Sequence, residues 1–473
     1  MNFSDNTPYD ILTEKWSPVL NHDALPGISD DYRKKVTAVL LENQEQAIRA
    51  QHLTEDMTSN NLGMPTSYTN TGAVSGYDPV LISLVRRAMP NLMAYDICGV
   101  QPMTAPTGLI FAMRANYGGC AYGATLAYAE AMFQEPQAEW GGSGWTLGLD
   151  FKGATAGYGL SAGYTSASPQ YIRALSAANF SRYRGILTSS GEGIGAGSDK
   201  YATFNQMAFS IDRVAVQART RALSSNYTIE LAQDLKAVHG LDAEAELANL
   251  LSTEILAEIN REIVKTIYYV AKSGSQQADI TSKGTYDLNV DSDGRWSAER
   301  FRGLTFQIER ECNAIAKETR RGKGNFIVCD SDTAAALAMS GFMSLSPAIA
   351  PQINADDTQG TFAGILNGKV RVYIDPYTPL GLNFFCAGYK GESPYDAGLF
   401  YCPYVPLQMV RAVDPDTFQP RIAFKTRYGV VANPYVLNVT GPNGPVPDGD
   451  SLTQGLNQYY RLTFVTNLHG NTI

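Results

Sequence analysis

The stretch from Tyr395 to Pro434 constrains the fold most, because it predicts two strands joined by a turn at Asp414-Pro415-Asp416. On the second strand the residues fall into two alternating sets. One set is mainly apolar (Ile422, Phe424, Thr426, Tyr428, Val430), and the other is mainly basic (Arg421, Ala423, Lys425, Arg427). Successive side chains of a strand point to opposite faces. We therefore predict an antiparallel ribbon with one buried and one basic face.

A second strand signal runs from Gln206 to Arg221 and changes phase within it. The apolar residues shift by one position between Ile211 and Val214, which predicts a bulge near Asp212-Arg213. Gly108 to Arg114 is its predicted partner strand.

The intervening segment, Tyr117 to Asn205, is rich in glycine and aromatic residues. We interpret it as a small inserted domain, and a flexible low-complexity segment is the alternative. A carbohydrate-binding surface is a third possibility, although aromatics in a small domain more often form its own core. The aromatics concerned are Trp140, Trp145, Tyr158 and Tyr164.

Two helices are predicted after the strand signal of Gln206 to Arg221, with Gly240 ending the first and Asp242 capping the second. The second has apolar residues mostly four apart, from Leu247 to Val270. If it runs from Asp242 to Lys272 it is a rod of ~46 Å.

An α/β block is predicted from Phe301 to Val405. An amphipathic helix from Ser297 to Arg321 ends at Gly322 and Gly324. Strands are predicted at Asn325–Cys329, Lys369–Ile374 and Asn383–Gly388, with a short helix at Asp332–Met339.

The first 55 residues predict a separate helical leader, because Ser29 or Asp30 can cap an amphipathic helix there. The leader holds nine acidic and five basic residues, counted from the sequence, a net charge of -4. The following stretch, Asp56 to Gly76, is rich in Thr, Ser, Asn and Gly and predicts an extended arm.

Composition narrows the class of protein. The chain of 473 residues is long enough for several subdomains. No apolar run approaches the ~18 residues of a membrane span, and the N-terminus lacks a signal-peptide pattern. A net charge of -9 argues against nucleic-acid binding as the main work of the surface. The cysteines are scattered and predict buried free thiols: Cys98, Cys120, Cys312, Cys329, Cys386 and Cys402.

Motifs for catalysis or cofactor binding are incomplete. Asn289 to Gly294 begins like a calcium loop, but Arg300 stands at the twelfth position. Gly191 to Ala196 matches GxGxxA without a preceding strand, and Gly364 to Lys369 is too short for a P-loop. We therefore expect no enzyme, and no catalytic, cofactor-binding or metal site.

The ribbon from Tyr395 to Pro434 resembles the signature of the major capsid protein of T-even-type, contractile-tailed phages. Further segments resemble that family in the same order: Leu84–Arg114, Tyr227–Val264, Gly322–Ser331 and Phe362–Tyr377. The resemblance covers most of the chain after Leu84. It fails in Tyr117–Asn205 and after Pro434.

The resemblance implies an α+β, Hong Kong 97-type capsid fold. The implied parts are a propeptide (1–55), an N-terminal arm (56–105), an extended loop with an inserted subdomain (106–222), a peripheral domain with a spine helix (223–300), an axial domain (301–405), and a return hairpin with a C-terminal tail (406–473). Hexamers would form an icosahedral shell around double-stranded DNA in the virion, after assembly in the bacterial cytoplasm. The implied partners are further copies of the chain, a vertex protein, portal, scaffolding proteins, a prohead protease and decoration proteins. A pentameric vertex protein of the same family is the open alternative.

The resemblance also implies a cleavage site, because the family's protease cuts after Leu-x-Glu. Leu53-Thr54-Glu55 matches at a change of composition, so we predict cleavage between Glu55 and Asp56, although Leu12-Thr13-Glu14 matches too. Basic residues of the strands are the predicted contacts between subunits. They are Arg213, Arg219, Arg221, Arg421, Lys425 and Arg427.

Overall fold

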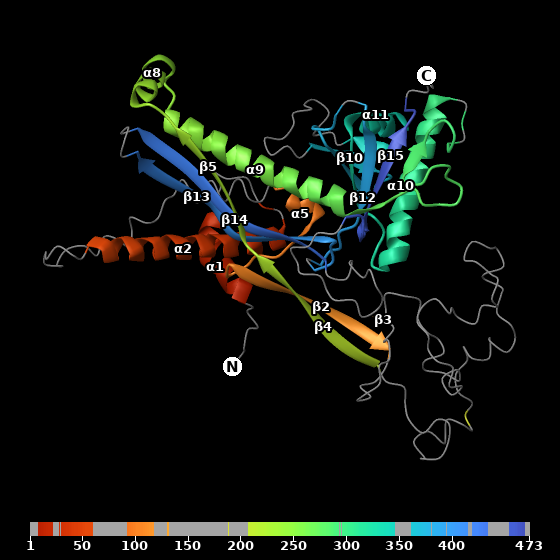
Figure 1. Ribbon diagram of the computed structural model, residues 1–473, viewed down its shortest axis with the longest axis horizontal. Coiled ribbons are helices and arrows are strands. Elements are labelled where there is room, and N and C mark those ends of the chain that lie inside the picture. The colour runs from red at the N-terminus through yellow and green to blue at the C-terminus, as the bar shows by residue number, and fades with distance from the viewer. Residues whose placement is uncertain are drawn as a thin grey trace. The chain divides into compact units, whose positions relative to one another are not determined.

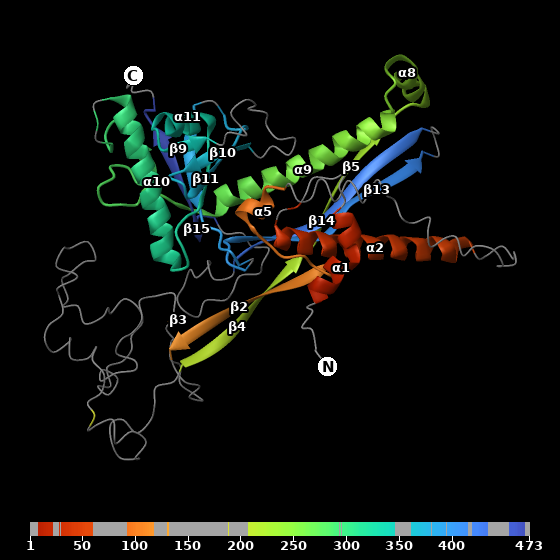
Figure 2. The same cartoon turned by 180° about the vertical axis from the view of Figure 1, so that it is seen from behind.

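The computed structural model contains helices and sheets, which confirms the α+β class (Figures 1 and 2). It describes residues 8–21, 28, 30–59, 92–117, 130–131, 188, 207–292, 294, 296–345, 361–379, 381–393, 395–414, 419–433 and 454–468. The chain divides into two compact units. The first comprises Met1–Ile110, Ala215–Val436 and Asp448–Ile473, and the second comprises Phe111–Val214 and Leu437–Pro447.

The predicted ribbon forms the middle of the first sheet of the first unit. The order of this sheet is β1-β13-β14-β5, at Gly99–Val100, Leu399–Val413, Pro420–Ala432 and Arg219–Asn226. β13 and β14 are antiparallel, with Met409 opposite Phe424. Phe424 is buried and Lys425 is exposed, so the predicted alternation of faces is confirmed.

The long helix α9, Ala243–Val270, lies against β5 and β14 (Figure 1). Asp242 caps it, because its side chain accepts a hydrogen bond from the Glu244 backbone N–H at 3.2 Å. Gly240 ends the preceding helix α8, Ile229–His239, in the left-handed region at φ 69°. The buried face of α9 carries Ile255, Ile259, Ile263 and Ile267, each 0% exposed. The predicted long helix is therefore confirmed, and its C-terminal end, Val270, lies two residues before the predicted one.

The second sheet of this unit has the order β6-β15-β12-β8-β11-β10-β9, with β7 beside β15. The strands are β6 Ala271–Ser273, β7 Thr285–Asp287, β8 Phe326–Cys329, β9 Met343–Leu345, β10 Thr361–Leu366, β11 Val370–Ile374, β12 Asn383–Gly388 and β15 Asn457–Thr466. Two helices pack on it, α10 at Ser297–Thr319 and α11 at Ser331–Met339. The predicted strands and short helix of this block are confirmed. β15, between β6 and β12, lies in the segment where the sequence predicts only a tail.

The helix α10 ends earlier than the sequence predicts. Arg320 takes the left-handed conformation at φ 55°, so the helix stops before Gly322.

The leader is a pair of helices, α1 at Pro8–Leu20 and α2 at Asp31–Ser59, and it packs on the first unit. The expectation of a separate leader is wrong, because Leu40 and Leu41 are buried in the same cluster as Tyr401. Asp30 begins α2 as predicted by accepting from the Tyr32 backbone N–H at 3.0 Å. The helix continues through Ser59, so residues 56–59 are helical where an extended arm is predicted. The rest of the arm, 60–76, lies outside the described residues.

The remaining ribbon pairs β2, Thr107–Tyr117, with β4, Met207–Gln217, and with β3 at Glu130–Ala131. This confirms the predicted partner strand. β4 is continuous through Asp212 and Arg213, which is compatible with a bulge as well as with regular pairing, so the predicted bulge stays a prediction. Ala218 separates β4 from β5, and its N–H donates to the Pro106 carbonyl at 2.9 Å. Most of Tyr117–Asn205 lies outside the described residues, so both interpretations of that insertion stay predictions.

Candidate assembly and maturation sites

Five of the six predicted basic contacts lie on the first sheet, where they occupy two opposite faces. The basic residues of β14 alternate with buried side chains and so share one face: Arg421, Lys425 and Arg427. In β5, Arg221 stands opposite Thr426 and Arg219 stands opposite Tyr428. Opposed residues of neighbouring strands share a face. Because Thr426 and Tyr428 are buried toward α9, the β5 arginines lie on the face away from the basic residues of β14.

Arg221 makes several contacts within its own chain. Its guanidinium pairs with Glu258 at 2.7 Å and with Glu262 at 2.6 Å, both on α9. It also donates to the Tyr428 hydroxyl, which in turn donates to Glu262. Burial raises the pKa of Tyr428, and its hydrogen bond to Glu262 raises it further. This side chain therefore ties β5 and β14 to α9, and its role as a contact between subunits stays a prediction.

The other basic candidates differ in exposure. Arg421 pairs with Asp414, and the Arg427 guanidinium lies 5.4 Å from the centre of the Tyr404 ring. Arg219, Arg421 and Lys425 are exposed, and Arg427 is half-buried. Arg213 lies in β4, and its side chain is outside the described part of the chain.

The predicted cleavage site lies within α2. Leu53, Glu55 and Asp56 all belong to the backbone helix that ends at Ser59. Their side chains are outside the described part of the chain. A protease that binds an extended substrate must therefore unwind the end of this helix, and helix ends open at the lowest cost.

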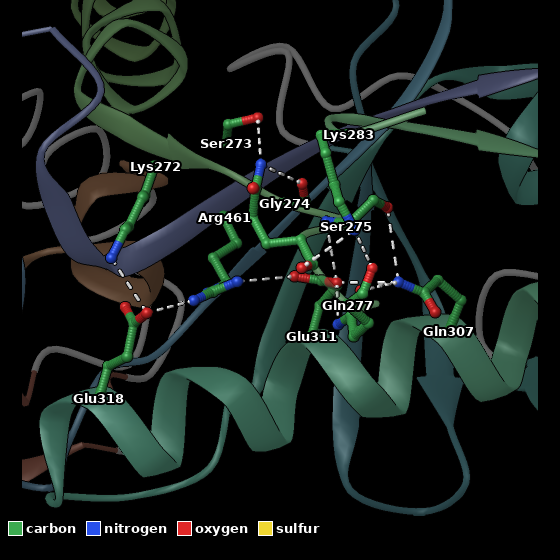
Figure 3. A network of polar contacts seen from close by, with 11 residues as sticks. Lys272, Ser273, Gly274, Ser275, Gln277, Lys283, Gln307, Glu311, Glu318 and Arg461 are labelled. Carbon is green, nitrogen blue, oxygen red and sulfur yellow. Dashed lines mark hydrogen bonds and ion pairs between the residues drawn. The ribbon is translucent and has the colours of Figure 1, made fainter. Parts of the chain in front are cut away.

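A network of ion pairs and hydrogen bonds joins the segment that follows α9, from Lys272 of β6 onward, to α10 and β15 (Figure 3). Glu311 of α10 is fully buried and accepts hydrogen bonds from the Ser275 backbone N–H at 3.0 Å and from Gln277 at 2.7 Å. Arg461 of β15 pairs with Glu311 at 3.3 Å and also with Glu318. Buried charges need partners of this kind, because burying them alone is costly. Gln307 donates to Glu311 at 2.8 Å, and Lys272 pairs with Glu318 at 3.0 Å.

Sequence patterns did not reveal this network. Glu311 and Arg461 are 150 positions apart, and neither lies in a motif. The sequence held one indication that Glu311 is buried, namely its place in α10 next to Cys312 of the buried face.

The described cysteines are buried free thiols. Burial raises the pKa of Cys98, Cys312, Cys386 and Cys402 to about 12 and also raises the pKa of Cys329. Thiols in this state are poor nucleophiles. Within the described ranges, no cluster of three or more potential ligands suits a metal ion, and no helix is long and apolar enough to cross a membrane.

Comparison with known proteins first defines the class, which is that of phage major capsid proteins. The chain is 35% identical to the major capsid protein of Enterobacteria phage T4, over 97% of this chain and 98% of that protein. The similarity to the capsid vertex protein of the same phage is 30% and covers 52% of this chain and 57% of that protein. The vertex alternative is therefore the weaker one.

The particular family follows from a second comparison. The family model described as major capsid protein Gp23 matches residues 74–465, and the chain belongs to this family. This confirms the family that the sequence motifs predict. Among solved structures, the capsid of Myoviridae Phage XM1 aligns at 8% identity over 78% of this chain and 90% of that chain, with a TM-score of 0.35.

Proposed function

We propose that this capsid component of the virion assembles mainly as hexamers, in the Hong Kong 97-type arrangement, into an icosahedral shell that encloses double-stranded DNA. The observation that carries the proposal is the similarity to a major capsid protein over nearly the full length of both chains. The chain acts mechanically and is not an enzyme. Its partners are further copies of itself, a vertex protein, portal, scaffolding proteins, a prohead protease and decoration proteins.

Electron microscopy of the purified chain tests this function. Six-fold capsomers or closed shells are the expected result. Five-fold capsomers alone would favour a vertex protein instead. Sedimentation that shows only a compact 51.3 kDa species at high concentration would contradict assembly of either kind.

Maturation is the second part of the proposal. Cleavage between Glu55 and Asp56 separates the leader, with a net charge of -4 out of a total of -9, from the rest of the chain. Hydrolysis makes this step irreversible. Glu55→Ala should leave uncut, immature particles, whereas Glu14→Ala, at another Leu-x-Glu match, should mature normally. A mature virion whose capsid chain still begins at Met1 by intact mass would refute the cleavage.

A further inference from the structure

The described residues of 8–46, in α1 and the first part of α2, form a helical hairpin with its own internal contacts. Lys15 of α1 pairs with Glu42 and Glu45 of α2 at 2.6 and 2.7 Å. The Trp16 indole N–H donates to Glu42 at 3.2 Å. These contacts link α1 to α2, so the leader is a folded unit and not a single exposed helix.

One face of this leader hairpin is part of the core of the first unit. Its buried apolar side chains are Trp16, Leu20, Val36, Ala38, Leu40 and Leu41. They share one cluster with Tyr401 and Leu407 of β13. Burial of apolar surface is the main favourable term in association, so this face provides a strong, non-directional attachment.

Polar contacts fix the position of the leader on the edge strand β1. The Tyr32 hydroxyl donates to the Val100 carbonyl. The amide of Asn43, which is buried, donates to the carbonyls of Met103 and Tyr404 at 2.8 Å each. Arg33 also pairs with Asp96, at the end of the short helix α5, Ala94–Ile97.

β1 is the outer strand of its sheet and pairs with β13 on one side. The Tyr32 hydroxyl of the leader therefore binds the Val100 carbonyl at the position where a further strand of the sheet would pair.

We propose that β1, the segment to Met103 and the adjoining part of β13 form a binding groove for the leader hairpin, an amphipathic helical peptide, and that this groove retains the leader after the chain is cut. The inference rests on the proposed cleavage at Glu55. That cut lies beyond residues 8–46 and removes none of the contacts just described. The covalent link only raises the effective concentration of the leader at its groove.

Release of the leader is therefore coupled to a change in the groove. When Asn43 and Tyr32 leave, three carbonyl oxygens lose their partners, at Val100, Met103 and Tyr404. Buried carbonyls without partners are costly, so the edge of the sheet must rearrange as the leader departs. Cleavage allows the leader to leave, and rearrangement of the groove completes its release.

The experiment uses the full chain with a recognition sequence for a site-specific protease inserted after Ser59. Unassembled subunits are cut at low concentration, so that a closed shell cannot trap the peptide. Size exclusion and native mass spectrometry after dilution then measure how fast the leader leaves. We expect the cut leader to remain bound to the rest of the chain.

Matched variants test the groove itself. Asn43→Ala should speed release by about tenfold or more, because it removes two buried hydrogen bonds, and Arg33→Ala should speed it less. Gln46→Ala, an exposed amide one turn further along α2, should release like the unsubstituted chain. Circular dichroism before cutting shows whether each variant is folded.

Two outcomes would overturn the inference. One is immediate loss of the unsubstituted leader upon cutting. The other is an equal release rate for folded Asn43→Ala, Arg33→Ala and Gln46→Ala. Because retention is measured on unassembled subunits with an added protease site, failure of shell formation or of cleavage at Glu55 gives a separate result.

Discussion

Reversal of the charge at Arg221 should act on folding, since this side chain is tied to α9. The Arg221, Glu258 and Glu262 side chains are 32%, 34% and 36% exposed. Ion pairs at such exposure contribute about 0.5–1 kcal/mol each. The hydrogen bond to the Tyr428 hydroxyl adds about 1 kcal/mol. Arg221→Gln should therefore lower the free energy of unfolding by about 2 kcal/mol.

Arg221→Glu should cost more, because it also places a third carboxylate beside Glu258 and Glu262. Two charges ~5 Å apart repel by about 1.5 kcal/mol at an effective dielectric constant of ~40. Two such repulsions, reduced by movement of the flexible side chains, bring the total to about 3–5 kcal/mol. This is a large part of the stability of an ordinary domain.

The matched control is Lys425→Glu, an exposed residue on the opposite face of the same sheet. Its change in unfolding free energy should stay within about 0.5 kcal/mol. Urea denaturation of unassembled subunits, followed by circular dichroism, measures all three variants. Equal stability of Arg221→Glu and Lys425→Glu would refute the reasoning.

Two further predictions concern buried groups. Glu311→Leu should destabilise the chain by about 3–5 kcal/mol in urea denaturation, because it leaves the buried Arg461 without one of its partners. The control Arg310→Leu removes a more exposed ion pair, with Asp279, and should cost about 1 kcal/mol or less. Equal costs for the two variants would contradict the role of burial. The described cysteines should resist maleimide at neutral pH until the chain is unfolded, and rapid labelling of Cys386 in the native chain would count against this. Since their folded-state pKa is raised above the ordinary 9.0 to about 12, the stability that they contribute is present below about pH 9 and is lost as the pH rises toward 12.

Local patterns in the sequence predicted the elements whose faces are set by regular spacing. The four-residue spacing from Leu247 to Val270 gave α9, and the alternation from Arg421 to Val430 gave β14. In both, one face is buried along most of the element, so the local sequence alone shows the period of burial.

Contacts between distant segments could not be predicted in this way. Arg221 was predicted only as a contact between subunits, because its partners lie on α9, 37 and 41 positions away. Glu42 and its partner Lys15 of α1 are likewise 27 positions apart. In each case a charge that looks suited to water is held by an opposite charge from another element.

Charged contacts therefore have a structural role along α9 that its apolar face cannot supply. Apolar burial is non-directional and tolerates small shifts, whereas ion pairs with fixed hydrogen-bond geometry define a register. Arg221 holds α9 to the first sheet, and Arg261 pairs with the buried Asp375, which follows β11 of the second sheet, at 2.7 Å. Lys272 continues this series just beyond the helix. Because these charges are used to position α9, contacts between subunits are better sought among the residues that remain exposed, of which Lys425 is the clearest on the first sheet.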